Sequence, residues 1–145
     1  MGFFFKTKEE KEEIRNQKRV KAEAEREAVR NSPITQIIRD YLREEFTGEG
    51  SGNVLSEFRS CEFAILNVYR SGVGITIHHK RKKPDGTSTT PFGILNFESI
   101  GYSNLNYNMV DELKKILFEE LLGLDCMQVS EISGDLYLHP IKKSW

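Results

Sequence analysis

Hydrophobic residues recur every three or four positions in two segments of the chain, which is the spacing of helices with one buried face. The first segment covers residues 33–47, where Ser32 is a favourable N-cap and Gly48 a favourable end. The second covers residues 109–122, with Asn108 as the expected N-cap. We therefore predict two amphipathic core helices. Their apolar stripes consist of Ile34, Ile37, Ile38, Tyr41, Leu42 and Phe46, and of Val110, Leu113, Ile116, Leu117 and Leu121.

Elsewhere, short runs rich in β-branched and aromatic residues indicate β-strands. Turns that contain glycine separate these runs. Because the strands follow one another as hairpins, we expect a largely antiparallel sheet. Residues 54–60 fit either a helical turn or a short strand. The five predicted strands lie at 63–69, 73–77, 92–97, 127–132 and 135–141.

Residues 6–31 differ in composition from the rest of the chain. Sixteen of these twenty-six residues are charged, nine basic and seven acidic, and good helix formers dominate. A coiled coil needs apolar residues at two positions of each heptad. The heptad seam that starts at Ile14 continues through Gln17, Lys21, Ala24 and Ala28, which is a poor match. We favour a solvated, partly frayed helical arm over a helix that dimerises or binds a partner.

These elements predict a fold of the α+β class. A largely antiparallel sheet of about five strands, in the order β-β-β-α-β-β, has two amphipathic helices packed on one face and a charged N-terminal helical arm. We expect the arm at residues 1–31 and a single α+β domain at residues 32–145. A domain of that size buries a sufficient core without a metal ion or a disulfide.

Residues 78–83 place four consecutive basic residues after two histidines. If the second and third strands extend as a ribbon from about residue 78 to residue 90, neighbouring side chains point to opposite sides. Such a ribbon suits a phosphate backbone. A solvated hairpin tip that discourages edge-to-edge pairing is the alternative, and we favour it because residues 33–145 carry a net charge of −3. The candidate contacts for nucleic acid or another anionic surface are His78, Lys80, Arg81, Lys82 and Lys83.

A polar, aromatic loop at residues 102–108 precedes the second core helix. Tyrosine and asparagine suit partner contacts because they combine contact area with adaptable hydrogen bonds at a low cost in entropy. An ordinary loop that caps the helix explains the same residues equally well. The candidate partner contacts are Tyr102, Asn104 and Tyr107.

The chain matches no catalytic or metal-binding template. Cys61 and Cys126 are expected to be reduced thiols near core elements, and no cofactor or metal ion is expected. The apolar run Phe3-Phe4-Phe5 is too short for a secretory signal, and no run of about 18 apolar residues is long enough to span a bilayer. We expect a cytoplasmic protein. Phe3, Phe4 and Phe5 are expected either to make weak contact with a membrane surface or to pack onto the core.

These observations favour a non-enzymatic protein-interaction module, expected to be dimeric and similar to a chaperone or adaptor. The order of its elements resembles that of small dimeric chaperone modules of bacterial secretion systems, although no motif accompanies this likeness of fold. Binding to nucleic acid or an anionic surface through residues 78–83 is the first alternative. An enzyme with an unrecognised pocket is the second.

Overall fold

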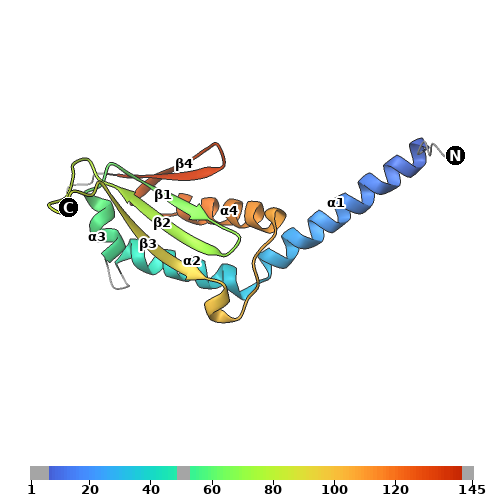
Figure 1. Ribbon diagram of the computed structural model, residues 1–145, viewed down its shortest axis with the longest axis horizontal. Helices are drawn as coiled ribbons and strands as arrows, with labels where there is room; N and C mark the ends of the chain where they lie inside the picture. Colours follow the sequence, from blue (N-terminus) through green and yellow to red (C-terminus); the bar gives the residue numbers. More distant parts are fainter. Residues whose placement is uncertain (1–6, 49–52, 142–145) are drawn as a thin grey trace.

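A computed structural model describes residues 7–48 and 53–141. Its sheet contains five antiparallel strands in the order β3-β2-β1-β5-β4 (Figure 1). The predicted α+β class, with its antiparallel sheet of about five strands, is therefore confirmed. The strands are β1 (Phe63–Val68), β2 (Gly72–His78), β3 (Thr89–Asn96), β4 (Met127–Ile132) and β5 (Asp135–Pro140).

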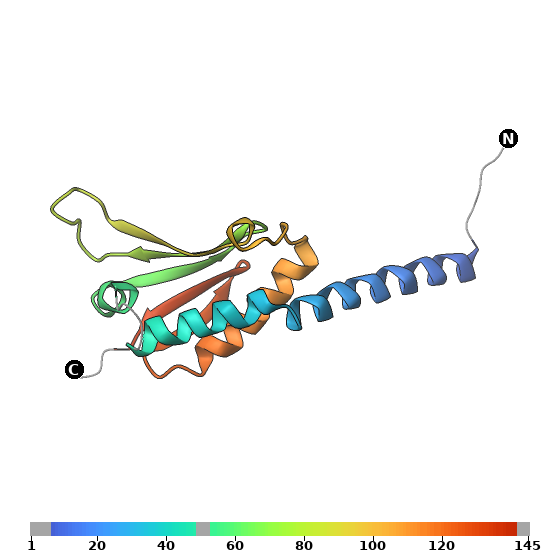
Figure 2. The same ribbon diagram turned by 90° about the horizontal axis from the view of Figure 1, so that it is seen from below.

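Two amphipathic helices, α2 (Pro33–Thr47) and α4 (Tyr107–Leu122), lie on the same face of the sheet (Figure 2). Their apolar stripes meet the sheet, so that Ile38 and Leu113 are fully buried. The undecided segment forms a third helix, α3 (Asn53–Arg59). Its Phe58 ring packs edge-on against Phe46 of α2 at 5.1 Å between centroids, which explains why a short helix persists here.

Local chemistry sets the ends of the core helices. The Ser32 side chain caps α2 by accepting from the Ile34 N–H, and Gly48 ends this helix with a φ of 82°. The predicted cap of α4 was wrong by two residues. Asn106 caps α4 by accepting from the Met109 N–H, whereas the Asn108 side chain donates to Glu25 of the arm. A tertiary contact therefore engages the asparagine that the local pattern favoured.

The arm is a 23-residue helix, α1 (Lys8–Arg30), that projects away from the sheet and its helices (Figure 1). A capping box between Thr7 and Glu10 starts it. Val29 is its one buried residue among those described. The last turns of α1 contact α4 through two polar pairs. Arg30 Nε donates to Glu112 Oε1 at 2.8 Å, and the Asn108 side chain donates to Glu25 Oε2 at 3.0 Å.

The hairpin between β4 and β5 follows the sequence, whereas the connection between β2 and β3 does not. Ser133 and Gly134 both have positive φ, of 53° and 83°, as a two-residue turn of type I′ requires. The expected long ribbon between β2 and β3 was wrong, because β2 ends at His78 and residues 79–88 form a loop. Backbone bonds from His79 N to Ser88 O and from Lys83 N to Thr87 O hold this loop, but its side chains do not alternate as in a strand.

Candidate functional site

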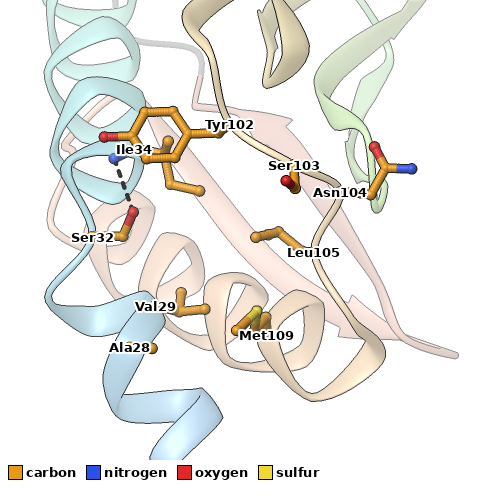
Figure 3. Close-up of a pocket in the computed structure, with 9 residues that line it drawn as sticks. All are labelled: Ala28, Val29, Ser32, Ile34, Tyr102, Ser103, Asn104, Leu105 and Met109. Atoms are coloured by element: carbon orange, nitrogen blue, oxygen red, sulfur yellow. Dashed lines mark hydrogen bonds between the residues drawn. The ribbon is translucent and has the colours of Figure 1, made fainter.

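A cavity of about 320 Å³ lies where α1, α2, α4 and the loop before α4 meet (Figure 3). We call it the arm-base cavity. Its apolar lining consists of Ala28, Val29, Ile34, Leu105 and Met109, and its polar lining of Ser32, Tyr102, Ser103 and Asn104. None of these nine residues carries a charged side chain. The cavity is therefore suited to an apolar group and offers no group for acid–base chemistry at neutral pH.

The floor and the rim of the arm-base cavity differ in exposure. Val29 and Ile34 are 2% and 1% exposed, and Leu105 is 7% exposed, so these side chains form a fixed floor. Ala28 and Tyr102 are exposed at the rim. An apolar cavity of about 150 Å³ is large enough to hold benzene. The volume here therefore accommodates an aromatic ring that enters from solvent.

The turn between α1 and α2 builds one wall of the cavity. The Thr35 hydroxyl donates to the Val29 carbonyl at 2.7 Å, and the Ser32 N–H donates to the same carbonyl at 3.0 Å. Thr35 is only 1% exposed, so the bond from its hydroxyl is shielded from competing water. The Arg30–Glu112 ion pair then holds the end of α1 against α4. Each contact joins residues of different helices, so the cavity exists only in the folded chain.

The loop at residues 101–106 builds the opposite wall. Gly101, with a φ of 81°, ends a 3-10 turn, η1 (Glu98–Ile100), and the Tyr102 N–H donates to the Phe97 carbonyl. Two bonds pin the loop further along, from the Leu105 N–H to the Arg70 carbonyl and from Arg70 Nε to the Leu105 carbonyl. The Tyr102 ring lies near Ile34 in Figure 3, on the side away from Met109.

The three predicted partner contacts lie at two cavities. Tyr102 and Asn104 line the arm-base cavity, although the Asn104 side chain points away from it (Figure 3). Asn104 also lines a second cavity of about 490 Å³, together with Tyr107. Tyr107 is 74% exposed, and the guanidinium carbon of Arg70 lies 5.3 Å from its ring centroid. The loop therefore presents residues to both cavities, and Asn104 stands between them.

Four of the five predicted anion contacts lie together. Lys80, Arg81, Lys82 and Lys83 line a cavity of about 410 Å³ in the loop between β2 and β3, with Ser60 and His79. Glu57 of α3 pairs with the Lys83 ammonium at 3.1 Å and with His79 Nε2 at 3.2 Å. Among the described residues, Lys80, Arg81 and Lys82 have no ion-pair partner. Three adjacent cations are thus left to attract an anion.

His78 lies elsewhere, on the sheet face opposite α2 and α4. Its ring stacks on Phe63 at 4.5 Å between centroids, with 9° between the planes. Tyr137 and His139 of β5 flank the same phenylalanine at 5.8 Å and 6.2 Å. In Figure 2 no described helix covers this face. This aromatic cluster was not predicted from the sequence because its residues come from three strands. The alternation along β1 does show that Phe63 and Ile65 lie on the face opposite the core.

Burial and pairing alter the acidity of few groups. Burial raises the pKa of the Cys61 thiol to about 11, and the half-buried Cys126 thiol donates to the Phe46 carbonyl at 3.6 Å. A hydrogen bond from Arg30 lowers the pKa of Glu23.

Residues 7–48 and 53–141 contain no cluster of three or more His, Cys, Asp or Glu side chains able to hold a metal ion. None of the helices in these ranges is both long and apolar enough to cross a membrane. Phe3, Phe4 and Phe5 lie outside the described residues.

Comparison of the chain with protein-family models, with curated proteins and with solved structures finds no match. The site is therefore interpreted from its own geometry. Of the surfaces described, the arm-base cavity combines a buried apolar floor, an accessible rim and two residues that the sequence analysis singled out.

Proposed function

We propose that this protein is a non-enzymatic protein-interaction module whose arm-base cavity accepts an apolar side chain of a protein partner. The observation that supports this proposal is the uncharged cavity itself, with Val29, Ile34 and Leu105 buried at its floor and Tyr102 exposed at its rim. A pocket of this kind is suited to an anchor residue, since burial of one aromatic side chain supplies a large part of the binding free energy at an interface.

The polar groups of the cavity favour a protein side chain over a small metabolite. Small-molecule sites combine apolar walls with several placed polar groups that orient the ligand. Here the Ser32 hydroxyl already accepts from the Ile34 N–H, and the Asn104 side chain points away from the cavity, so the hydroxyl groups of Tyr102 and Ser103 are the polar side-chain groups left in its lining. Cys61 and Cys126 are thiols rather than halves of a disulfide, which supports the further proposal of a reducing, cytoplasmic location.

Methyl NMR with a single aromatic side chain tests the proposal. N-acetyl-L-phenylalaninamide, titrated to millimolar concentration, should cause saturable shifts of the Ala28, Val29 and Met109 methyl signals. The change Ala28→Trp should abolish these shifts because the indole fills the rim of the cavity. Val20→Trp is the matched control, since Val20 is 65% exposed on the same helix and does not line the cavity.

Absence of saturable shifts at the cavity methyl groups would refute the proposal. Shifts that survive in Ala28→Trp would also count against it, because the probe would then bind elsewhere. Equal loss of binding in Val20→Trp would mean that a large residue on α1 disturbs the fold, and far-UV circular dichroism of both variants separates that case.

A second candidate function rests on the basic loop. We propose, as the alternative, that Lys80, Arg81 and Lys82 bind the phosphate groups of a nucleic acid. These three cations lie beside a cavity and lack carboxylate partners among the described residues, which leaves their charge available. Each phosphate contact on a single strand contributes about −0.7 to the slope of log K against log salt concentration.

Fluorescence anisotropy with a labelled single-stranded oligonucleotide tests this alternative. Changing Lys80, Arg81 and Lys82 together to serine should weaken binding and reduce the salt slope by about 2. The matched control changes Lys114 and Lys115 of α4 to serine. Affinity that is unchanged by the triple substitution would refute the alternative. Binding to phosphatidylserine vesicles but not to the oligonucleotide would assign the loop to an anionic surface instead.

A further inference from the structure

We infer that the arm-base cavity receives the Phe3–Phe5 segment of a second copy of this chain, delivered by antiparallel pairing of two α1 helices. This inference rests on the proposed function, because it names the protein partner of the same cavity. It explains three features together, which are the exposed arm, the apolar triplet that precedes it and the cavity at its base.

One stripe of α1 leads directly to the cavity. Thr7, Glu10, Gln17, Lys21, Ala24 and Ala28 of this stripe are exposed, and Ile14 is half-buried. These seven residues follow the heptad spacing that places side chains on one seam of a helix. The side-chain hydrogen bonds from α1 to α4 use other residues, Glu25 and Arg30. The seam is therefore available to another helix along its whole described length, and its last residue lines the cavity.

The charges on this seam select one antiparallel register. When Ile14 of one copy faces Gln17 of the other, Glu10 faces Lys21, and by symmetry each such pair occurs twice. In the same register Thr7 of one copy faces Ala24 of the other, so the sequence that precedes Thr7, with its three phenylalanines, leads toward Ala28. Parallel pairing in register would instead place Glu10 on Glu10 and Lys21 on Lys21. The register that pairs opposite charges is thus the one that brings the phenylalanines to the cavity.

The phenylalanines cannot enter the cavity of their own chain. Lys8 and Ala28 are twenty residues apart on α1, which is about 30 Å at 1.5 Å per residue. Phe3, the farthest of the three from the helix, precedes Lys8 by five residues, which span at most about 18 Å. A second copy, running in the opposite direction, is free of this limit because its N-terminal segment lies beside the base of the first arm.

The seam alone is too polar to hold two helices together. Its layers pair Ile14 with Gln17, Thr7 with Ala24 and Glu10 with Lys21. Ile14 is the one large apolar residue among the described seam residues, whereas a stable coiled coil has such residues at nearly every seam position. Insertion of a phenylalanine ring at each end supplies the apolar burial that the seam lacks. We therefore expect an assembly that depends on Phe3–Phe5 and that weakens with salt through the two charge pairs.

Analytical ultracentrifugation of the full chain tests the inference. The wild type should be a dimer, and a variant with Phe3, Phe4 and Phe5 changed to serine should raise the dissociation constant at least about 100-fold. A matched variant with the three residues changed to leucine should retain the dimer. Isotope-filtered NOEs in a mixture of labelled and unlabelled chains should join phenylalanine ring protons of one copy to the Met109 methyl group of the other.

Charge exchange tests the register. Lys21→Glu should weaken the dimer about tenfold, because the introduced carboxylate then faces Glu10 of the other copy and the two repel each other at both ends of the seam. The double change Glu10→Lys with Lys21→Glu should bind more tightly than Lys21→Glu, without full recovery, because Glu10→Lys also removes the capping box between Thr7 and Glu10. Arg15→Glu, which reverses a charge on α1 outside the seam, is the control and should have a smaller effect. A double variant no tighter than Lys21→Glu would overturn the register.

The outcomes separate this inference from the proposed function. The serine variant is expected to be a monomer and to bind N-acetyl-L-phenylalaninamide more tightly than the wild type, because Phe3–Phe5 no longer compete for the cavity. That result would support both the inference and the proposed function. If the probe binds the cavity but the serine variant keeps the oligomeric state of the wild type, the inference fails and the proposed function stands. A monomeric wild type whose binding to phosphatidylserine vesicles requires Phe3–Phe5 also overturns the inference. If N-acetyl-L-phenylalaninamide binds neither the wild type nor the serine variant, both the inference and the proposed function fail.

Discussion

The ion pair between Arg30 and Glu112 offers the sharpest test of how the arm is held. Arg30 lies at the end of α1, and its Nε donates to Glu112 of α4 at 2.8 Å. The Glu112 side chain is 10% exposed, whereas the Arg30 side chain is 44% exposed. The change Arg30→Ala therefore leaves a carboxylate in a mostly buried place without its hydrogen-bond donor.

The expected cost follows from this difference in exposure. A hydrogen bond to a charged group contributes about 1.5–3 kcal/mol when it is shielded from water. Solvent screening at the half-exposed guanidinium reduces that range, so we expect Arg30→Ala to lower the free energy of unfolding by about 1.5 kcal/mol. The matched control is Arg26→Ala. Its contact with Glu23 is longer, at 3.5 Å, and the two side chains are 35% and 54% exposed, so we expect a loss of under about 0.5 kcal/mol.

Urea unfolding followed by far-UV circular dichroism measures both losses. A double-mutant cycle that combines Arg30→Ala with Glu112→Ala should give a coupling energy of about 1 kcal/mol. A coupling energy near zero, or equal losses for Arg30→Ala and Arg26→Ala, would refute the reasoning that this pair fixes the arm on α4. Arg30→Ala should also weaken binding of N-acetyl-L-phenylalaninamide, because Val29 precedes Arg30 and forms part of the cavity floor.

The same substitution has a pH dependence of predictable sign. The Arg30 guanidinium lowers the pKa of Glu23 below its ordinary value of 4.5, so the folded state binds fewer protons than the unfolded state in mild acid. This contribution to stability is present above about pH 4.5 and is lost as the pH falls through the folded-state pKa. The difference in stability between wild type and Arg30→Ala should therefore shrink from about pH 5 to about pH 3. A difference that grows on acidification would contradict the assignment.

Three further predictions concern the core and the thiols. Leu113→Ala should cost about 2–5 kcal/mol in urea unfolding, since Leu113 is fully buried, whereas Leu122→Ala on the same helix should cost under about 1 kcal/mol because Leu122 is 55% exposed. Gly72→Ala should cost at least about 2 kcal/mol in the same assay, because a Cβ there would collide with the Leu95 carbonyl oxygen of β3. Near pH 8, a chromogenic disulfide reagent should modify Cys126 at least about tenfold faster than Cys61, whose pKa burial raises to about 11, and equal rates would contradict this assignment.

The sequence alone was sufficient to predict an element where the spacing of apolar residues within that element shows which of its faces is buried. The stripe from Ile34 to Phe46 predicted α2 because a helix with one apolar face buries that face wherever it packs. The turn at Ser133 and Gly134 was predictable because only these two residues separate the predicted strands 127–132 and 135–141, and a two-residue link that contains glycine favours a tight hairpin. The antiparallel pairing within β1-β2-β3 and within β4-β5 followed from the succession of hairpins. The antiparallel pairing of β1 with β5 did not, because the chain crosses the sheet through α4 between β3 and β4.

Choices between similar neighbours were decided by tertiary contacts. Asn106 and Asn108 are both good caps, and the contact of Asn108 with Glu25, 83 residues earlier in the chain, leaves Asn106 as the cap. His78 was grouped with the basic residues that follow it because it adjoins them in sequence. In the folded chain β2 ends at His78, and the His78 ring stacks on Phe63. Of the five predicted anion contacts, only the four that follow His78 therefore line the cavity in the loop between β2 and β3.

Some residues of the arm-base cavity were predicted from the sequence, and others were identified only in the structure. Tyr102 and Asn104 were identified from composition, because a loop rich in tyrosine and asparagine suits contact with a partner. Ala28 and Val29 were not identified, because a helix as polar as α1 has no periodic apolar face that would mark its last turn as buried. Their role depends on where α1 meets α2 and α4, and those contacts join residues far apart in the chain.

The amino-acid sequence by itself thus determined the two core helices, the five strands in their chain order and the charged character of the arm, since these follow from side-chain chemistry within about ten residues of each position. Only the tertiary structure decided that the last turn of the arm closes a cavity over Leu105 and Met109, and that the aromatic side chains of three strands meet on one sheet face. Both arrangements arise from packing between segments that are distant in the chain. Such packing must bury apolar area and, at the same time, give each buried polar group a hydrogen-bond partner.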